Sequence, residues 1–210
     1  MTNRPLQNRV LPDGSIVATR ERGTMMGNRG GAFHTDIQTL GARHGHSRQW
    51  ICCVLEFKNW HRQVMQPRRY TELFFLDEAT ALAAGHRPCF ECRRTAALDF
   101  AARWNICRRE TGRATADHMD RILHAERLDQ NGAKRIHKAT IETLPDSTFF
   151  RHSGGVARTA GRYIQAWSLG GYGKHLPRPK GIEVEVLTPR SIVAVLGAGY
   201  VPVLHTSATS

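Results

Sequence analysis

Alternating apolar positions and strand-forming residues predict three short strands in the first half of the chain. They cover residues 15–17, 50–57 and 70–76, and a Pro-Asp-Gly turn precedes the first of them. In a strand over 50–57, every second residue from Ile51 to Phe57 lies on one apolar face, and Cys52 lies on the other. We therefore expect the Cys53 side chain to point into the interior. The glycine-rich stretch 23–31 is predicted to be a loop.

Helical spacing predicts three helices between residues 77 and 131. Asp77 is a suitable N-cap for a short Ala-rich helix over 78–84, which ends before Gly85. Thr115 is the corresponding cap of the third helix. Between them, a longer helix over 93–110 carries an apolar stripe that we expect to face the core: Ala97, Phe100, Trp104 and Cys107.

Near residue 139 the pattern changes to short runs of strand-forming residues. These runs cover 140–143, 148–151, 155–159, 162–167 and 181–187. Thr188-Pro189 then starts a last helix, with Thr188 as its cap, that ends near Gly197, and 201–205 is predicted to be a terminal strand. The fold class that follows is α+β.

Charge and composition narrow the classes of protein. With 40% apolar residues in 210, the chain can bury a core, which excludes a disordered protein. Its 30 Lys plus Arg against 18 Asp plus Glu give a net charge of +12, which favours a nucleic-acid partner. No segment approaches the roughly 20 apolar residues that span a bilayer, and the first ten residues lack a secretory signal. These features predict a cytoplasmic protein without a membrane partner.

The cysteines carry the sharpest chemical signal. In a reducing compartment, the five cysteines are expected to be metal ligands, reactive thiols or buried apolar residues rather than disulfides. Cys89 and Cys92 are separated by two residues in a turn after a proline, a spacing that lets both thiols bind one Zn²⁺ at about 2.3 Å. Cys53 is the best candidate for a third ligand. The fourth ligand stays open among Cys52, His46, His34, His44, His61 and Cys107.

Two other interpretations of the Cys89–Cys92 pair stay open. A pair of this spacing at the start of a helix can be a redox dithiol, because the helix dipole lowers a thiol pKa. The two cysteines can also be unliganded residues of a turn. For Cys107, a place in the apolar stripe favours a buried hydrophobic role over a ligand role.

Arginines crowd the same region. On a helix that begins near residue 93, basic side chains away from the apolar stripe can follow a line of phosphates. The alternative is an ordinary solvated helix face. The candidate nucleic-acid-binding residues are Arg87, Arg93, Arg94, Arg108 and Arg109.

One helix face also offers candidates for catalysis. Asp117, Asp120 and His124 recur at i, i+3 and i+7 of the third predicted helix, where a carboxylate can orient an imidazole or share a second metal. An exposed helix that forms ion pairs has the same spacing. No Ser-His-Asp order or HExxH string singles out another histidine.

Residues 70–94, YTELFFLDEATALAAGHRPCFECRR, resemble the second half of the zinc-binding domain of Ada-type adaptive-response DNA repair proteins. The resemblance implies that Cys89 and Cys92 bind zinc and that Arg87, Arg93 and Arg94 lie near a DNA backbone. In that family, an upstream pair of cysteines completes a four-thiolate site, and one of them accepts a methyl group from a phosphotriester. Here Cys52 and Cys53 are adjacent and lie further upstream, so the acceptor cannot be assigned by position.

Together these features predict a zinc-bearing N-terminal region of short strands and about three helices, residues 1–138, and a small β-rich domain with one helix, residues 139–210. The expected function is nucleic-acid binding, DNA rather than RNA, by a zinc-containing protein with a link to DNA repair. In this interpretation the zinc is structural and the arginines contact phosphates. The main alternative is a zinc-dependent enzyme acting on nucleic acid, either a thiolate alkyl acceptor or a hydrolase that uses Asp117 and His124. A module that binds an acidic protein is the third hypothesis.

Overall fold

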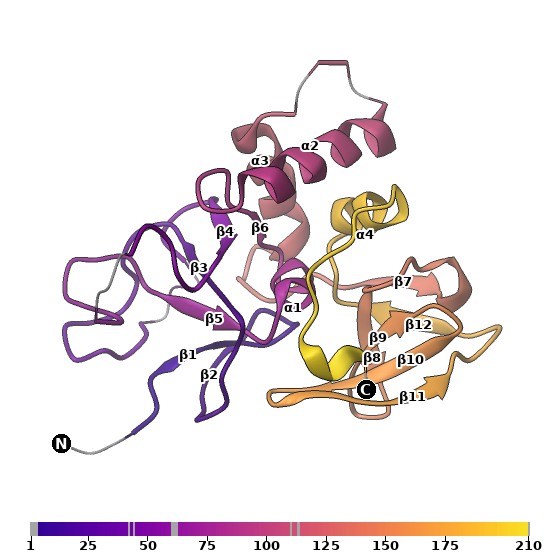
Figure 1. Cartoon of the computed structure of the whole chain (residues 1–210), viewed down its shortest axis with the longest axis horizontal. Helices are drawn as coiled ribbons and strands as arrows, with labels where there is room; N and C mark the ends of the chain where they lie inside the picture. Colours follow the sequence, from indigo (N-terminus) through magenta and orange to yellow (C-terminus); the bar gives the residue numbers. More distant parts are fainter. Residues whose placement is uncertain are drawn as a thin grey trace.

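The computed structural model describes residues 4–41, 43, 45–59, 63–109, 111–112 and 114–209. In this part of the chain, helices combine with two six-stranded sheets, which confirms the α+β class. One sheet is built from residues 7–88 and the other from residues 137–186. Figure 1 shows the helices between and above the two sheets. None of these helices is long and apolar enough to cross a membrane.

The first sheet has the strand order β2-β1-β5-β3-β4-β6. Its strands are β1 (Gln7–Val10), β2 (Ile16–Ala18), β3 (Met25–Arg29), β4 (Trp50–Cys53), β5 (Leu73–Phe75) and β6 (Arg87–Pro88). The pairs β1–β5 and β4–β6 are parallel, and the other neighbours are antiparallel.

Strand β3 corrects the prediction that residues 23–31 form a loop. Its residues alternate between buried and half-buried, as expected for a central strand. Gly27 is needed here for close packing, because a Cβ atom at this position would lie 2.1 Å from the carbonyl oxygen of Ile51. Glycine therefore marks close contact between neighbouring strands in this segment.

Helix α1 (Glu78–Ala83) confirms the role of Asp77, whose side chain accepts a hydrogen bond from Thr80 N at 2.9 Å. Helix α2 (Arg94–Arg108) buries the predicted apolar stripe from Ala97 to Trp104. Helix α3 (Ala116–Arg127) begins after Thr115, which accepts from His118 N at 3.2 Å. Cys107 is only partly buried and packs at the edge of the core cluster formed by these helices.

The second sheet is antiparallel, with the order β11-β10-β9-β8-β12-β7. Its strands are β7 (His137–Thr140), β8 (Phe149–His152), β9 (Gly155–Ala160), β10 (Tyr163–Ser168), β11 (Gly171–Pro177) and β12 (Glu183–Val186), with a short 3₁₀ turn η1 (Ile141–Thr143) after β7. The expected boundary between 138 and 139 falls inside β7. The edge strand β11 was not predicted.

Helix α4 (Arg190–Gly197) returns to the first half of the chain and packs on α2 and α3. Its N-cap is Pro189, while Thr188 accepts instead from Phe149 N, so the predicted role of Thr188 is wrong. In place of a side-chain cap, the Glu126 carboxylate of α3 accepts from Ser191 N at 2.8 Å and from its hydroxyl at 2.7 Å.

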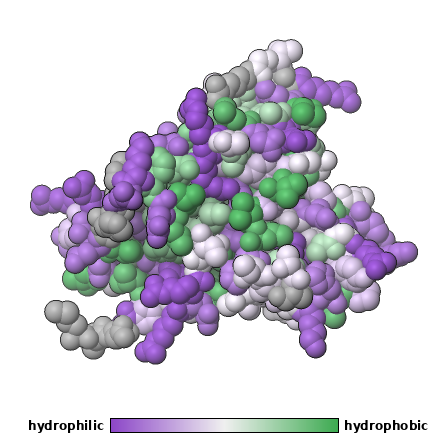
Figure 2. Space-filling view, in the orientation of Figure 1, coloured by the Kyte–Doolittle hydropathy of each residue, from purple (hydrophilic) through white to green (hydrophobic). Residues whose placement is uncertain are grey.

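Residues 201–205 are extended but belong to neither sheet, so the predicted terminal strand is wrong. They lie along α1, where Glu78 N donates to Val203 O at 3.1 Å. A 3₁₀ turn, η2 (Thr206–Thr209), follows. In Figure 2, apolar residues gather near the middle of a mostly hydrophilic face. Val201 and Val203 of this segment are exposed.

Candidate metal centre

Three thiols meet beside the end of the first sheet. The Sγ atoms of Cys53, Cys89 and Cys92 all lie within 4.8 Å of one another. Cys53 is the last residue of β4, Cys89 follows β6 directly, and Cys92 lies in the turn before α2. A tetrahedral zinc with Zn–S bonds of about 2.3 Å requires sulfur atoms about 3.8 Å apart. The cluster therefore has the dimensions of a metal centre.

Parallel pairing of β4 with β6 explains how these distant residues meet. Cys52 lies opposite Pro88 in the ladder, and Cys89 N donates to Cys52 O at 2.9 Å. This register places Cys53 and Cys89 at the same end of neighbouring strands. Strand β4 stops at Cys53 rather than continuing to residue 57, so the chain turns away beyond the thiol.

The turn from Cys89 to Cys92 surrounds a sulfur atom with backbone donors. Glu91 N donates to Cys89 Sγ at 3.4 Å. Hydrogen bonds from the Cys53 and Cys92 thiols, with further help from the backbone, lower the pKa of Cys89 to about 2. A sulfur atom that receives several N–H groups is stabilised as a thiolate, which is the form that binds a metal.

The pKa values of the other two thiols are raised. Hydrogen bonding to Cys89 raises the pKa of Cys53. For Cys92, the hydrogen bond with Cys53 lowers the pKa, but the bond with Cys89 and burial together raise it. A divalent cation supplies the charge that stabilises all three as thiolates, so this donor set fits a soft metal ion such as Zn²⁺.

Cys52 and Cys107 are placed away from the three thiols. Cys52 points from the opposite face of β4 into a core cluster and is fully buried, with Arg93 Nη1 3.7 Å from its sulfur. Burial raises its pKa. Cys107 Sγ donates to Trp104 O at 3.2 Å within its own helix. Neither cysteine joins the cluster.

The histidine candidates also have other surroundings. His34 contacts the Thr71 hydroxyl at 2.7 Å and Gln66 O at 3.2 Å through its two ring nitrogens. His46 lines a separate pocket that includes His124. His44 and His61 lie outside the described residues. Within the described ranges, no fourth His, Cys, Asp or Glu joins the three thiols.

The three thiols line a pocket of about 460 Å³. Most of its other walls are apolar: Met26, Ile51, Val54, Leu55, Phe57, Val64, Tyr70 and Phe74. Glu72 also lines it and is 2% exposed. Its Oε2 accepts from Met65 N at 2.7 Å, and its Oε1 has no hydrogen-bond partner within the described part of the chain. The cluster thus adjoins a space large enough for a small organic group, with a buried carboxylate beside it.

Sequence reasoning missed Glu72 and the pocket. The available signal was a single acidic residue inside the apolar run 70–76. A charged residue in a buried strand requires a partner or a function, because burying an unpaired charge is costly.

Two of the predicted nucleic-acid-binding arginines are buried. Arg87 binds Asp120 through two hydrogen bonds of 2.9 and 2.7 Å, and Arg93 binds Glu78 through two of 2.7 Å. Their side chains are 5% and 6% exposed. These guanidinium groups are occupied inside the protein, which corrects their assignment to phosphate contacts. The exposed Arg94, Arg108 and Arg109 remain predictions.

The three candidate catalytic residues of α3 also differ in burial. Asp120 is buried and its two oxygen atoms accept from Arg87, so it cannot orient His124. Asp117 and His124 are exposed. The i, i+3, i+7 spacing therefore reflects one structural ion pair and two surface residues.

Scans against family models, curated proteins and solved structures find no match to this chain.

Proposed function

We propose that this protein binds zinc through Cys53, Cys89 and Cys92 and acts on nucleic acid, DNA rather than RNA, in a role linked to DNA repair. The observation that carries the proposal is the placement of three thiols, within 4.8 Å of one another, in the wall of a pocket. A structural zinc is normally enclosed by four protein ligands, whereas a reactive centre keeps one side accessible.

Two further features support a nucleic-acid partner. The net charge of +12 attracts a polyanion and accelerates its association. Residues 70–94 resemble the zinc-binding domain of Ada-type DNA repair proteins, and the pair Cys89–Cys92 lies inside that resemblance. Exposed Arg94, Arg108 and Arg109 on and after α2 offer positive charge on the surface.

Binding is tested with fluorescently labelled single- and double-stranded oligonucleotides of DNA and RNA. We expect binding of double-stranded DNA that weakens steeply between 50 and 200 mM salt, because phosphate contacts release counterions. An acidic peptide of equal charge is the control for a protein partner. Binding of the peptide but of no nucleic acid would contradict the proposal and favour the protein-interaction hypothesis.

The pocket favours a zinc-dependent enzyme as the second candidate. In an alkyl acceptor, a cysteine thiolate attacks the methyl carbon of a phosphotriester, the S–C bond forms, the C–O bond breaks, and the phosphodiester leaves with the electron pair. In a hydrolase, the buried Glu72 carboxylate accepts a proton from a water molecule that enters the pocket. Glu72 is a better candidate for the general base than Asp117 or His124, because it lines the pocket of the three thiols.

Two measurements separate these chemistries. An alkyl acceptor gains 14 Da on one cysteine after exposure to DNA with methylated phosphates, and Glu72→Gln still gains it. A hydrolase forms product repeatedly, and Glu72→Gln loses turnover while its metal content is retained. An unchanged protein mass together with no product limits the protein to binding.

A further inference from the structure

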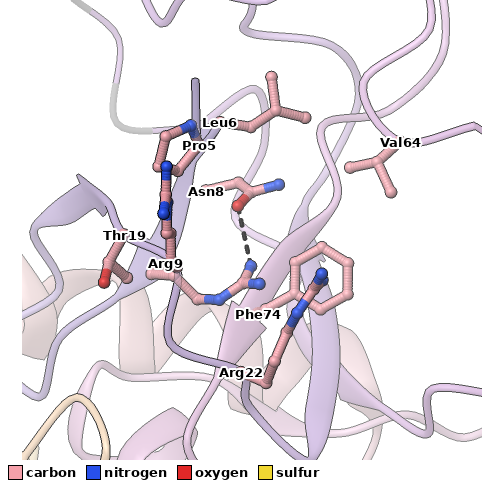
Figure 3. A pocket seen from close by; sticks show the side chains of 9 residues that line it. Pro5, Leu6, Asn8, Arg9, Thr19, Arg22, Val64 and Phe74 are labelled. Carbon is pink, nitrogen blue, oxygen red and sulfur yellow. Dashed lines mark hydrogen bonds between the residues drawn. The ribbon is translucent and has the colours of Figure 1, made fainter. Parts of the chain in front are cut away.

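A second pocket, of about 380 Å³, lies on the first sheet between the N-terminal segment and β5. Its walls include three arginines, Arg9, Arg20 and Arg22, with Asn8, Thr19 and the ring of Phe74. Figure 3 shows the Arg9 and Arg22 side chains extending along this pocket beside Phe74. No acidic residue is among the described residues that line it.

Arg9 is the fixed member of the cluster. It is 8% exposed, and its Nε donates to Glu21 O at 2.8 Å while its Nη1 donates to Asn8 Oδ1 at 2.9 Å. The guanidinium carbon lies 4.6 Å from the centroid of the Phe74 ring. Its partners are neutral oxygen atoms, so these contacts orient the guanidinium without neutralising its charge.

Arg20 and Arg22 are exposed and bring two more charges to the same pocket. Burial and the charge of Arg22 lower the pKa of Arg9, which shows that the cations repel one another. Glu21 lies between them in the sequence, but its carboxylate points away from the pocket. It lies beside Gly170 in the turn between β10 and β11, 3.3 Å from the place that a Cβ atom would take if residue 170 had one. The pocket thus brings three positive charges together, and a bound anion would reduce the repulsion between them.

This pocket adjoins the pocket of the metal centre, because Val64 and Phe74 line both. A ligand whose anionic group lies against the arginines can therefore extend past Phe74 toward the three thiols. Phosphate suits the anionic end, since guanidinium groups bind its oxygen atoms in pairs.

We infer that Arg9, Arg20 and Arg22 form a phosphate-binding pocket that holds a phosphodiester of the nucleic acid next to the metal centre. This inference rests on the proposed function for the source of the phosphate, a nucleic-acid strand. Arg9, Arg20 and Arg22 line an open pocket and can contact a phosphate, whereas Arg87 and Arg93 are buried in ion pairs. An adjacent group of the strand then reaches the thiol pocket.

The test uses the full-length zinc-loaded protein and two double variants. Arg20→Ala/Arg22→Ala removes two charges from the pocket, and Lys174→Ala/Lys180→Ala removes two exposed charges associated with the second sheet. Anisotropy of a labelled duplex is measured from 50 to 200 mM salt. We expect the arginine variant to bind about tenfold more weakly, with the slope of log K against log salt reduced by about 2. The lysine variant should change affinity less than twofold.

A second arm separates the inference from the proposed function. Inorganic pyrophosphate is titrated against the same proteins and followed by calorimetry. If the wild type binds no nucleic acid but binds pyrophosphate, and only the arginine variant loses this binding, the phosphate pocket stands and the nucleic-acid function falls. Equal loss of duplex affinity in both variants, or duplex binding unaffected by the arginine substitutions, would overturn the inference while the proposed function stands. Binding of neither ligand would overturn both.

Discussion

The buried pair Arg93–Glu78 makes the strongest energetic prediction. Glu78 opens α1 and Arg93 precedes α2, and the Glu78 carboxylate also accepts from the Tyr200 hydroxyl at 2.6 Å and from Val203 N at 2.8 Å. The Glu78 carboxylate thus connects α1 with the end of the Cys89–Cys92 turn and with the C-terminal segment. Arg93→Ala would leave this buried charge without its cation.

Removing one partner of a buried ion pair typically costs about 3–5 kcal/mol, because the remaining charge is desolvated and uncompensated. Both side chains of this pair are almost fully buried, so the upper part of the range applies. For a chain of this length, each kcal/mol lowers Tm by about 2–4 °C, so a loss of about 4–5 kcal/mol lowers Tm by roughly 8–20 °C.

Arg94→Ala is the matched control, since Arg94 is the next residue and is exposed. Urea unfolding followed by circular dichroism should show a large loss for Arg93→Ala and a change within about 0.5 kcal/mol for Arg94→Ala. The double variant Glu78→Gln/Arg93→Met should lose less free energy of unfolding than the single variants Glu78→Gln and Arg93→Met lose in sum. Equal stability of Arg93→Ala and Arg94→Ala would refute the structural role of the pair.

Three other predictions concern the fold. Burial lowers the pKa of His86 well below its usual value, so the stability that depends on neutral His86 is present above pH about 6.5 and is lost toward pH 5 by up to about 1.4 kcal/mol per unit. In His86→Gln, the urea midpoint of unfolding should depend less on pH between about pH 6.5 and 5 than in the wild type. The same dependence on pH in both proteins would contradict the prediction. Gly27→Ala should destabilise by about 3 kcal/mol or more, whereas Gly41→Ala, whose Cβ meets nothing closer than 3.9 Å, should unfold at the wild-type midpoint. Glu126→Ala should cost about 1–2 kcal/mol by uncapping α4, and loss of less than 0.5 kcal/mol would exclude a capping role.

Local signals in the sequence predicted the helices well. The caps Asp77 and Thr115 bind backbone N–H groups within three residues, and the stripe from Ala97 to Trp104 follows directly from the period of the helix. Such features depend on neighbours in the chain. They could be read without knowledge of the tertiary structure.

Features that depend on distant partners were harder to predict. Arg87 and Arg93 looked like surface cations because their carboxylate partners lie 33 and 15 positions away. Strand β11 escaped prediction because Gly171–Pro177 is an edge strand with mostly exposed residues and little apolar alternation. Gly27 suggested a loop, although its role is to admit a neighbouring strand.

The candidate metal centre combined both kinds of signal. The Cys89–Cys92 spacing is local. The expectation that Cys53 rather than Cys52 points inward is wrong, because Cys52 lies in the core cluster and Cys53 lines the pocket on the other face of β4. The deciding contact, parallel pairing of β4 with β6, joins segments with 33 residues between them and has no local signature. The adjoining pocket and the arginine pocket arise only when these strands assemble.

Zinc content per chain in a series of single Cys→Ala variants tests the central claim most directly. The wild-type protein should hold one zinc, and X-ray absorption should show three sulfur ligands at about 2.3 Å. Cys53→Ala, Cys89→Ala and Cys92→Ala should each lose the metal, while Cys52→Ala and Cys107→Ala should retain it. A metal-free wild type, or loss of zinc in Cys52→Ala but not in Cys53→Ala, would contradict the account.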